Sequence, residues 1–184
     1  FFTFFGMLPF YFSGSIDTIT NAFFETMSGF TTTGATILDD IESLSHGMLF
    51  WRSLTQWIGG LGIVFFTIAI LPIFTTGGVQ LFSAESTGVT HDRTHPKINV
   101  MAKWLWTIYL VLTVSETVLL MFGGMSLFDA ICQSFATTAT GGYSTKQNSI
   151  SYWNSPYIEY VVAIFMIVSS INSVSYTHLR AHET

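Results

Sequence analysis

Residues 31–34 read Thr-Thr-Thr-Gly, and residues 138–141 read Thr-Ala-Thr-Gly. Each stretch lies between strongly apolar segments of the chain. A threonine-glycine turn placed between membrane spans can direct backbone carbonyl oxygens at a cation that has lost its water. Because the arrangement occurs twice, the sequence predicts two copies of one helix–pore-loop–helix unit, and with them ion conduction.

The composition is typical of a membrane protein. Of the 184 residues, 49% are hydrophobic and 9% are charged, whereas soluble domains carry about 25% charged residues. The charges gather in loops between apolar segments long enough to cross a bilayer, which requires about 20 residues. The sequence therefore predicts an all-α, polytopic membrane protein in contact with the lipid bilayer.

The first predicted unit covers residues 1–74 and opens with the end of an outer helix at 1–13. An amphipathic stretch follows at 16–30. As a helix it would be roughly 20 Å long, at ~1.5 Å per residue, which is too short to cross the bilayer. This length suits a re-entrant pore helix, so we expect a pore helix and filter over residues 16–36.

The inner helix of the first unit is predicted over residues 48–74. Its glycines at 59, 60 and 62 would let another helix approach closely. A polar loop at 75–97 follows the inner helix.

The second predicted unit, residues 98–172, repeats this layout. It has a helix at 98–122, a pore helix and filter at 127–145, and a truncated helix at 157–172. Matching Gly34 to Gly141 aligns the two threonine-glycine stretches, but the preceding helices then align only if the second is one residue shorter.

The orientation follows from the distribution of basic residues. Both pore loops must enter from one face, and the loop at 75–97 lies on the other. Basic residues near that loop outnumber those on the pore-loop face: Arg93, Lys97 and Lys103 against Arg52 and Lys146. The positive-inside rule places the loop at 75–97 in the cytoplasm, so the pore loops would enter from outside.

Several motifs together resemble one family. They are SGFTTTGATIL from residue 28, WRSLTQWIGGLGI from 51, GGVQLFSAES from 77, AKWLWTIYL from 102, ATTATGGYST from 136 and YWNSPYIEY from 152. The chain is similar to the Trk/Ktr/HKT superfamily of potassium transporters, and within it to the bacterial TrkH subunits, over about residues 1–172. The resemblance implies four helix–pore-loop–helix units around one potassium pathway, of which about two are present here.

The resemblance also implies a location, partners and a boundary. It implies a multi-pass protein of the bacterial inner membrane that forms a homodimer and binds a cytosolic nucleotide-binding regulatory subunit, with no cofactor. Phe1 starts inside an apolar run, so we expect a piece of a longer protein. Residues 173–184 turn polar where the family continues an apolar helix, so we expect a tail foreign to the protein.

Potassium is predicted to bind backbone carbonyls of the two threonine-glycine loops. Glycine permits the required backbone angles and leaves the axis open, and threonine hydroxyls can bond their surroundings. The predicted filter residues are Thr32, Thr33 and Gly34 with Ala139, Thr140 and Gly141, and less strongly Thr31, Thr138 and Gly142. The alternative for these residues is an ordinary helix-ending turn between buried helices.

Two acidic residues in predicted helices have open roles. Glu25, in the first pore helix, can attract cations or bond neighbouring backbone, and we favour the structural role. Glu116, in the helix at 98–122, is a candidate because acids inside membranes are often functional. It lies near the outer end of that helix, so it can also reach the interface.

The sequence has no enzyme signature. It lacks a phosphate-binding glycine loop, an HExxH motif, a nucleophile elbow and a basic patch for nucleic acid. Potassium uptake driven by the membrane potential is the leading hypothesis, with coupling to H⁺ or Na⁺ left open. A non-transporting membrane scaffold that binds helices through its glycine-rich span is the alternative.

Overall fold

The structure, a computed structural model, describes residues 2–62 and 95–179, with side chains over 2–62 and 106–170. Every regular element in these residues is a helix, which confirms the predicted all-α class for the described part of the chain. The elements are α1 (Phe2–Gly6), α2 (Leu8–Phe12), α3 (Ile19–Phe30), a helical segment at 46–62, α5 (His95–Phe122), α6 (Leu127–Thr138), the 3-10 helix η1 (Ser149–Trp153) and α7 (Pro156–Leu179).

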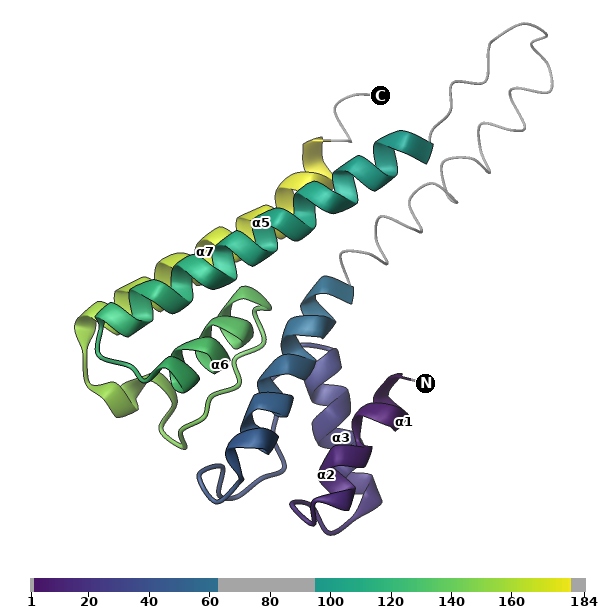
Figure 1. The fold of residues 1–184 in the computed structure, drawn as a ribbon, viewed down its shortest axis with the longest axis vertical. Helices are drawn as coiled ribbons and strands as arrows, with labels where there is room; N and C mark the ends of the chain where they lie inside the picture. Colours follow the sequence, from purple (N-terminus) through teal and green to yellow (C-terminus); the bar gives the residue numbers. More distant parts are fainter. Residues whose placement is uncertain (1, 63–94, 180–184) are drawn as a thin grey trace, which may run out of the picture.

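The predicted outer-helix end at 1–13 is helical but broken at Met7. Pro9 has no N–H with which to bond the Phe5 carbonyl, so the helical ladder is interrupted between α1 and α2. Both short helices pack against α3 (Figure 1).

The helices α3 and α6, which precede the two threonine-glycine loops, begin with the same kind of cap. The Thr18 hydroxyl accepts the N–H of Asn21 at 3.3 Å, and the Ser126 hydroxyl accepts the N–H of Asp129 at 3.1 Å. Such caps satisfy backbone donors that have no partner within the helix. The predicted start of the first pore helix at residue 16 is wrong, because the backbone at Thr18 is still extended.

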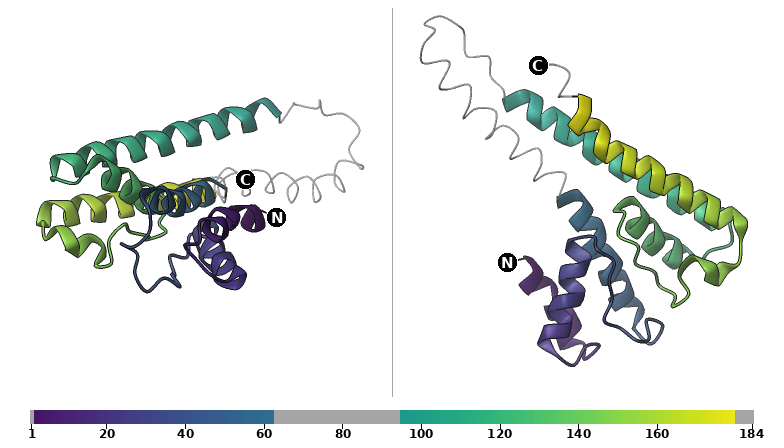
Figure 2. Two further views of the ribbon diagram at one scale, coloured as in Figure 1. Left: turned by 60° about the horizontal axis from the view of Figure 1, so that its bottom comes forward. Right: turned by 180° about the vertical axis from the view of Figure 1, so that it is seen from behind.

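The two long helices α5 and α7 lie side by side and run in opposite directions, and α6 packs against both (Figures 1 and 2). The helical segment 46–62 lies beside α3. Gly124, with φ 94°, follows the end of α5, where a left-handed residue turns the chain out of the helix.

Two predicted boundaries need correction. α5 begins at His95, so the predicted loop at 75–97 ends earlier. Pro96 is compatible with this start because the first helical turn needs no N–H there. α7 continues to Leu179, past the predicted end at 172. The short helix η1 lies between the predicted filter at 127–145 and the predicted helix at 157–172.

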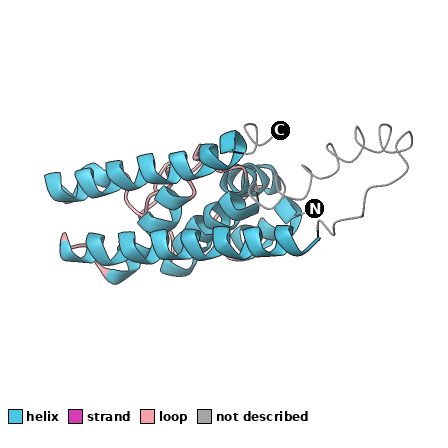
Figure 3. Cartoon of the chain, turned by 90° about the horizontal axis from the view of Figure 1, so that it is seen from above, coloured by secondary structure: helices cyan, strands magenta, loops and turns pink. Residues whose placement is uncertain are grey.

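Helices joined by loops account for all the described elements, as Figure 3 shows from a third side. Across the described ranges, no helix combines enough length with enough hydropathy to cross a membrane. Helices are present where the sequence predicts spans at 98–122 and 157–172. Of the predicted inner helix and loop, residues 63–94 lie outside the described ranges.

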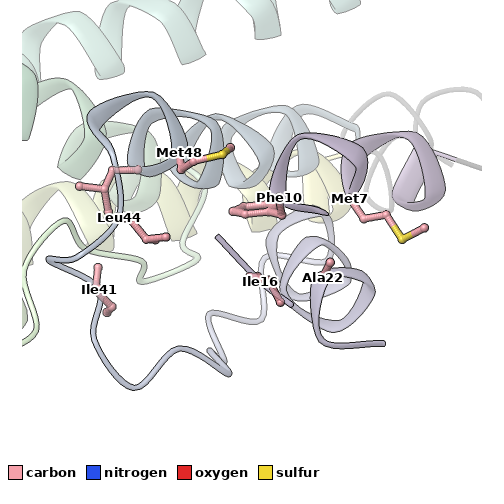
Figure 4. Packing of buried hydrophobic residues seen from close by; sticks show 8 residues of the cluster. Met7, Phe10, Ile16, Ala22, Ile41, Leu44 and Met48 are labelled. Atoms are coloured by element: carbon pink, nitrogen blue, oxygen red, sulfur yellow. The ribbon is translucent and has the colours of Figure 1, made fainter. Parts of the chain in front are cut away.

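Each half of the described chain has its own apolar core. The first joins α2, α3 and the start of segment 46–62 (Figure 4), and the second joins α5, α6 and α7. The first contains Met7, Phe10, Ile16, Ala22, Ile41, Leu44, Met48 and Leu49. The second contains Leu120, Met125, Ala130, Ile158, Val161 and Val162. The two halves also meet through apolar contacts, because Phe128 of α6 packs against the first core and Phe135 of α6 lies against Phe50 of segment 46–62.

Candidate functional site

The loops that follow α3 and α6 leave their helices in the same way. After α3, the N–H of Thr32 bonds the Gly29 carbonyl and the N–H of Thr33 bonds the Ser28 carbonyl, both at 3.0 Å. This pair of bonds is a Schellman motif, in which the residue after the cap takes a left-handed conformation. That residue is Thr32, with φ 53°.

The second loop repeats this motif. The N–H of Thr140 bonds the Thr137 carbonyl at 2.9 Å, and the N–H of Gly141 bonds the Ala136 carbonyl at 2.8 Å. The left-handed residue here is Thr140, with φ 54°. Glycine usually occupies such a position, and a β-branched residue there is an outlier.

The backbone therefore matches Thr32 with Thr140, and Gly34 with Gly142. Gly34 and Gly142 both have positive φ, 77° and 84°. α3 and α6 each contain 12 residues, so the predicted shorter second helix and the pairing of Gly34 with Gly141 are wrong. The two adjacent glycines of the second loop caused the error, because only the backbone angles distinguish them.

The structure brings the two loops into contact. A Cβ atom added to Gly34 would overlap the carbonyl oxygen of Gly141. Glycine at position 34 is therefore required both by its left-handed backbone and by this close approach. Thr31, Thr33 and Thr140 have exposed side chains, whereas Ala139 is buried.

The threonine hydroxyls of the first loop bond within the loop and its helix. The hydroxyl of Thr31 bonds the Met27 carbonyl and the Thr33 hydroxyl, each at 2.8 Å. The hydroxyl of Thr32 donates to the Thr31 carbonyl at 2.8 Å. These local bonds hold the loop in shape after the helix ends.

Gln56, on the helical segment 46–62, joins the two loops and was not predicted as a site residue. Its side chain is fully buried, and its Oε1 accepts the N–H of Tyr143 at 3.1 Å. A Cβ atom on Gly141 would lie 2.6 Å from both Nε2 and Oε1 of Gln56. The available sequence signal was the polar pair Arg52 and Gln56, spaced four apart in a helix that contains many apolar residues.

Arg52 crosses from the first half to the second. Its Nε donates to Glu25 Oε1 at 2.6 Å, and its Nη1 donates to the Ser144 carbonyl at 3.0 Å. Its guanidinium carbon lies 3.7 Å from the centre of the Tyr143 ring. Arg52 is only 2% exposed, so its charge is buried between the two halves.

Glu25 has the structural role that the sequence analysis favoured. Besides the ion pair with Arg52, its carboxylate accepts the Thr36 hydroxyl and the N–H of Ile37, both at 3.0 Å. The buried charge is thus paired and hydrogen-bonded, as a buried charge must be. These bonds tie the end of the first loop back onto α3.

Tyr143 completes the connection between the two halves. Its hydroxyl donates toward the carbonyls of Glu25 at 3.0 Å and Ala35 at 3.2 Å. Burial, and then the neighbouring Glu25 carboxylate, raise the pKa of Tyr143. The phenol therefore keeps the proton that it donates.

Glu116, on α5, lies next to the last residue of α6 and is not part of the contact between the two loops. It is fully buried on α5, which excludes the reading that it reaches the interface. The Thr138 hydroxyl lies 3.5 Å from its Oε2, whereas Oε1 has no hydrogen-bond partner in the described residues. Thr138 is the last residue of α6 and is buried, so the structure places it in the helix and not in the loop.

The close-approach prediction for the glycines of the inner helix is confirmed at two of three positions. A Cβ on Gly59 would overlap the backbone of Phe30, and one on Gly60 would lie 2.7 Å from the Tyr109 hydroxyl and 3.1 Å from Ala139. Nothing lies within 4 Å of a Cβ on Gly62. Segment 46–62 thus contacts Phe30, the last residue of α3, and Ala139, the residue that follows α6.

The structure resembles a solved transporter. It superposes on the crystal structure of the potassium transporter TrkH from Vibrio parahaemolyticus with a TM-score of 0.75 and 38% sequence identity. The match covers 90% of this chain and 32% of that one.

Curated relatives agree with the structural match. The chain is 52% identical over 169 residues to the Trk system potassium uptake protein TrkH of Escherichia coli K12, covering 91% of this chain and 35% of the relative. It is 39% identical over 156 residues to TrkG of the same organism, covering 84% of this chain and 32% of the relative. The chain thus spans about a third of the length of the curated relatives it matches.

A family model covers nearly the whole chain. The TrkH family, described as cation transport proteins, matches residues 2–180 and so extends past the predicted end of the resemblance at 172. This match confirms the prediction of a transport protein and not an enzyme. The chain therefore belongs to the TrkH family of cation transport proteins.

Proposed function

We propose that the whole protein takes up potassium, and that the loops at 31–34 and 139–142 are two quarters of its ion-binding filter. The observation that carries this proposal is the contact between Gly34 and the Gly141 carbonyl. It joins two loops of matching backbone, each at the end of a short helix. The named function of the relatives, potassium uptake in Trk systems, supports the choice of ion.

The chemistry requires oxygen atoms that replace the water of a potassium ion. Backbone carbonyls supply them where the chain runs through a non-helical segment beside the pathway. The C-terminal ends of α3 and α6 add partial negative charge near the same place. We assign the first quarter to Thr32, Thr33 and Gly34 and the second to Thr140, Gly141 and Gly142, with Thr31 and Ala139 at the matched entry positions.

We further propose the setting that the family resemblance implies. The protein would be a multi-pass component of a bacterial inner membrane, with residues 75–97 in the cytoplasm and both loops entered from outside. Two further units would complete the pathway, in a homodimer that binds a cytosolic nucleotide-binding subunit. The name "Trk system", shared by the relatives, supports association with other components.

Uptake by the full-length protein tests this function. Expressed in a bacterial strain that lacks its own potassium uptake, the protein should restore growth at low external potassium and carry Rb⁺ into the cells. A protein that reaches the membrane without restoring growth or Rb⁺ uptake would instead act as a membrane scaffold.

The filter assignment is tested by Gly34→Ser, which we expect to lower the preference for K⁺ over Na⁺. A side chain at this position meets the Gly141 carbonyl and strains a left-handed backbone, so the carbonyls must move. Gly124→Ser is the matched control, because Gly124 has φ 94° but nothing within 4 Å of its Cβ position. Equal K⁺/Na⁺ flux ratios in wild type and Gly34→Ser would contradict the assignment.

A further inference from the structure

Two buried polar side chains of the first half reach successive residues of the second loop. Arg52 donates to the Ser144 carbonyl, and Gln56 accepts the N–H of Tyr143. Arg52 and Gln56 are one helical turn apart on segment 46–62, so they lie on one face of that helix. Buried polar groups on a helix are costly unless they are bonded, and here the bonds go to the partner loop.

The described part of α7 has no equivalent pair. Counted from the first residue of each helix, His46 and Pro156, the positions of Arg52 and Gln56 fall on Val162 and Met166 of α7, which are both apolar. Over the described side chains, the polar connection between the loops comes from segment 46–62.

Gln56 lies at the narrowest point of that contact. Its amide group lies so close to Gly141 that a Cβ there would overlap it, and its Nε2 lies 3.9 Å from the Cβ position of Gly34. Nε2 is buried without a hydrogen-bond partner in the described residues. Since Oε1 is fixed by the Tyr143 N–H, the amide is held between the two glycines that form the loop contact.

We propose that Gln56 is a positioning residue that sets the spacing between the two loops and thereby a determinant of cation preference. The proposal rests on the potassium-uptake function proposed above. Gln56 bonds the second loop and lies beside Gly34 of the first, so the length of its side chain affects the distance between the carbonyls of the two loops. Selectivity by carbonyl cages depends on that geometry and on the number of oxygens that face the ion.

The test uses the full-length protein in liposomes, with Rb⁺ and Na⁺ fluxes measured separately. Gln56→Met keeps the length but removes the bond to Tyr143, and Gln56→Asn keeps the amide but is one methylene shorter. We expect both to lower the Rb⁺/Na⁺ flux ratio, because either change lets the carbonyls of the two loops shift relative to one another. The two variants change different properties of the side chain. If Gln56→Met does not fold, the flux ratio of Gln56→Asn alone tests the role of Gln56.

A matched control is Ser53→Ala on the same helix. Ser53 is also buried, and its hydroxyl donates at 3.1 Å to the Leu49 carbonyl of its own helix. The Ser53→Ala variant should therefore have the wild-type Rb⁺/Na⁺ flux ratio. If the wild type is active and the folded Gln56 variants have the same Rb⁺/Na⁺ flux ratio as the wild type, the role of Gln56 is overturned while the proposed function stands. A wild type that carries neither cation would overturn the proposed function and this inference with it.

Discussion

Thr32 and Thr140 hold the least favourable backbone conformations in the two loops. Both have φ near 54°, a region in which a β-branched residue is costly by about 1–3 kcal/mol. The Schellman bonds enforce the conformation, because the N–H of the left-handed residue and the N–H of the residue after it are both bonded to carbonyls at the helix end. Strain of this kind persists where the surroundings over-determine the backbone, and it is often linked to function.

Thr140→Gly separates the roles of strain and function. Relief of strain outweighs the extra unfolded-state entropy of glycine, about 0.5–1 kcal/mol, so thermal stability should stay equal or rise slightly. The loop gains freedom, however, so the K⁺/Na⁺ preference should fall. Thermal unfolding and ion flux of the full-length variant check both expectations. A clear loss of stability together with unchanged preference would contradict them.

At the level of single residues, the sequence identified the loops but not their connections. The threonine-glycine pattern located residues 31–34 and 138–141, yet the adjacent glycines of the second loop shifted the match by one position. Gln56 was missed because a polar residue spaced four from Arg52 also fits a membrane boundary. Only the fold shows that both side chains turn inward toward Tyr143 and Ser144.

Among the elements, segment 46–62 connects the two short helices. Arg52 bonds Glu25 on α3 and the Ser144 carbonyl beyond α6, while it stacks on Tyr143. Removing one partner of a buried ion pair leaves an uncompensated charge, which costs about 3–5 kcal/mol. The Arg52–Glu25 pair is therefore expected to hold α3 and segment 46–62 together.

A double-mutant cycle tests this connection. Glu25→Gln and Arg52→Met should each lower thermal stability strongly in the full-length protein. The double variant should lose less than the sum of the two, because neither charge is left unpaired. Glu42→Gln is a control, since its pairing with Lys146 spans 3.9 Å and is partly exposed and such pairs contribute little. Additive losses at Glu25 and Arg52 would contradict the pairing.

Helix positions were predictable from the sequence to within a few residues. The short apolar stretch before each loop predicted α3 and α6, because apolar residues at helical spacing mark such helices. The start of α3 was placed too early because the N-cap at Thr18 was not recognised. The start of α5 was placed too late because Pro96 suggested a loop, although proline fits the first turn. The end of α7 was placed too early because polar residues from 173 on suggested a break, yet polarity alone does not end a helix.

Considered as a whole, the chain has two helical halves, each with its own core, joined across the two loops. The composition and apolar segments predicted the helical class, and the resemblance of several motifs to known proteins predicted the family. Both loops were expected to enter from one face, and the structure places Gly34 against the carbonyl of Gly141. The side chains that hold this contact come from distant parts of the sequence. Local sequence patterns do not predict such long-range packing.

If the two loops are parts of one filter, their backbone oxygens bind a single cation between them. An experimental structure of the full-length protein in Rb⁺, with the ion located by its anomalous scattering, tests this most directly. We predict a Rb⁺ peak within coordination distance of carbonyl oxygens from both residues 31–34 and residues 139–142. A well-ordered filter region without a peak there, or with Rb⁺ bound only elsewhere, would contradict the claim.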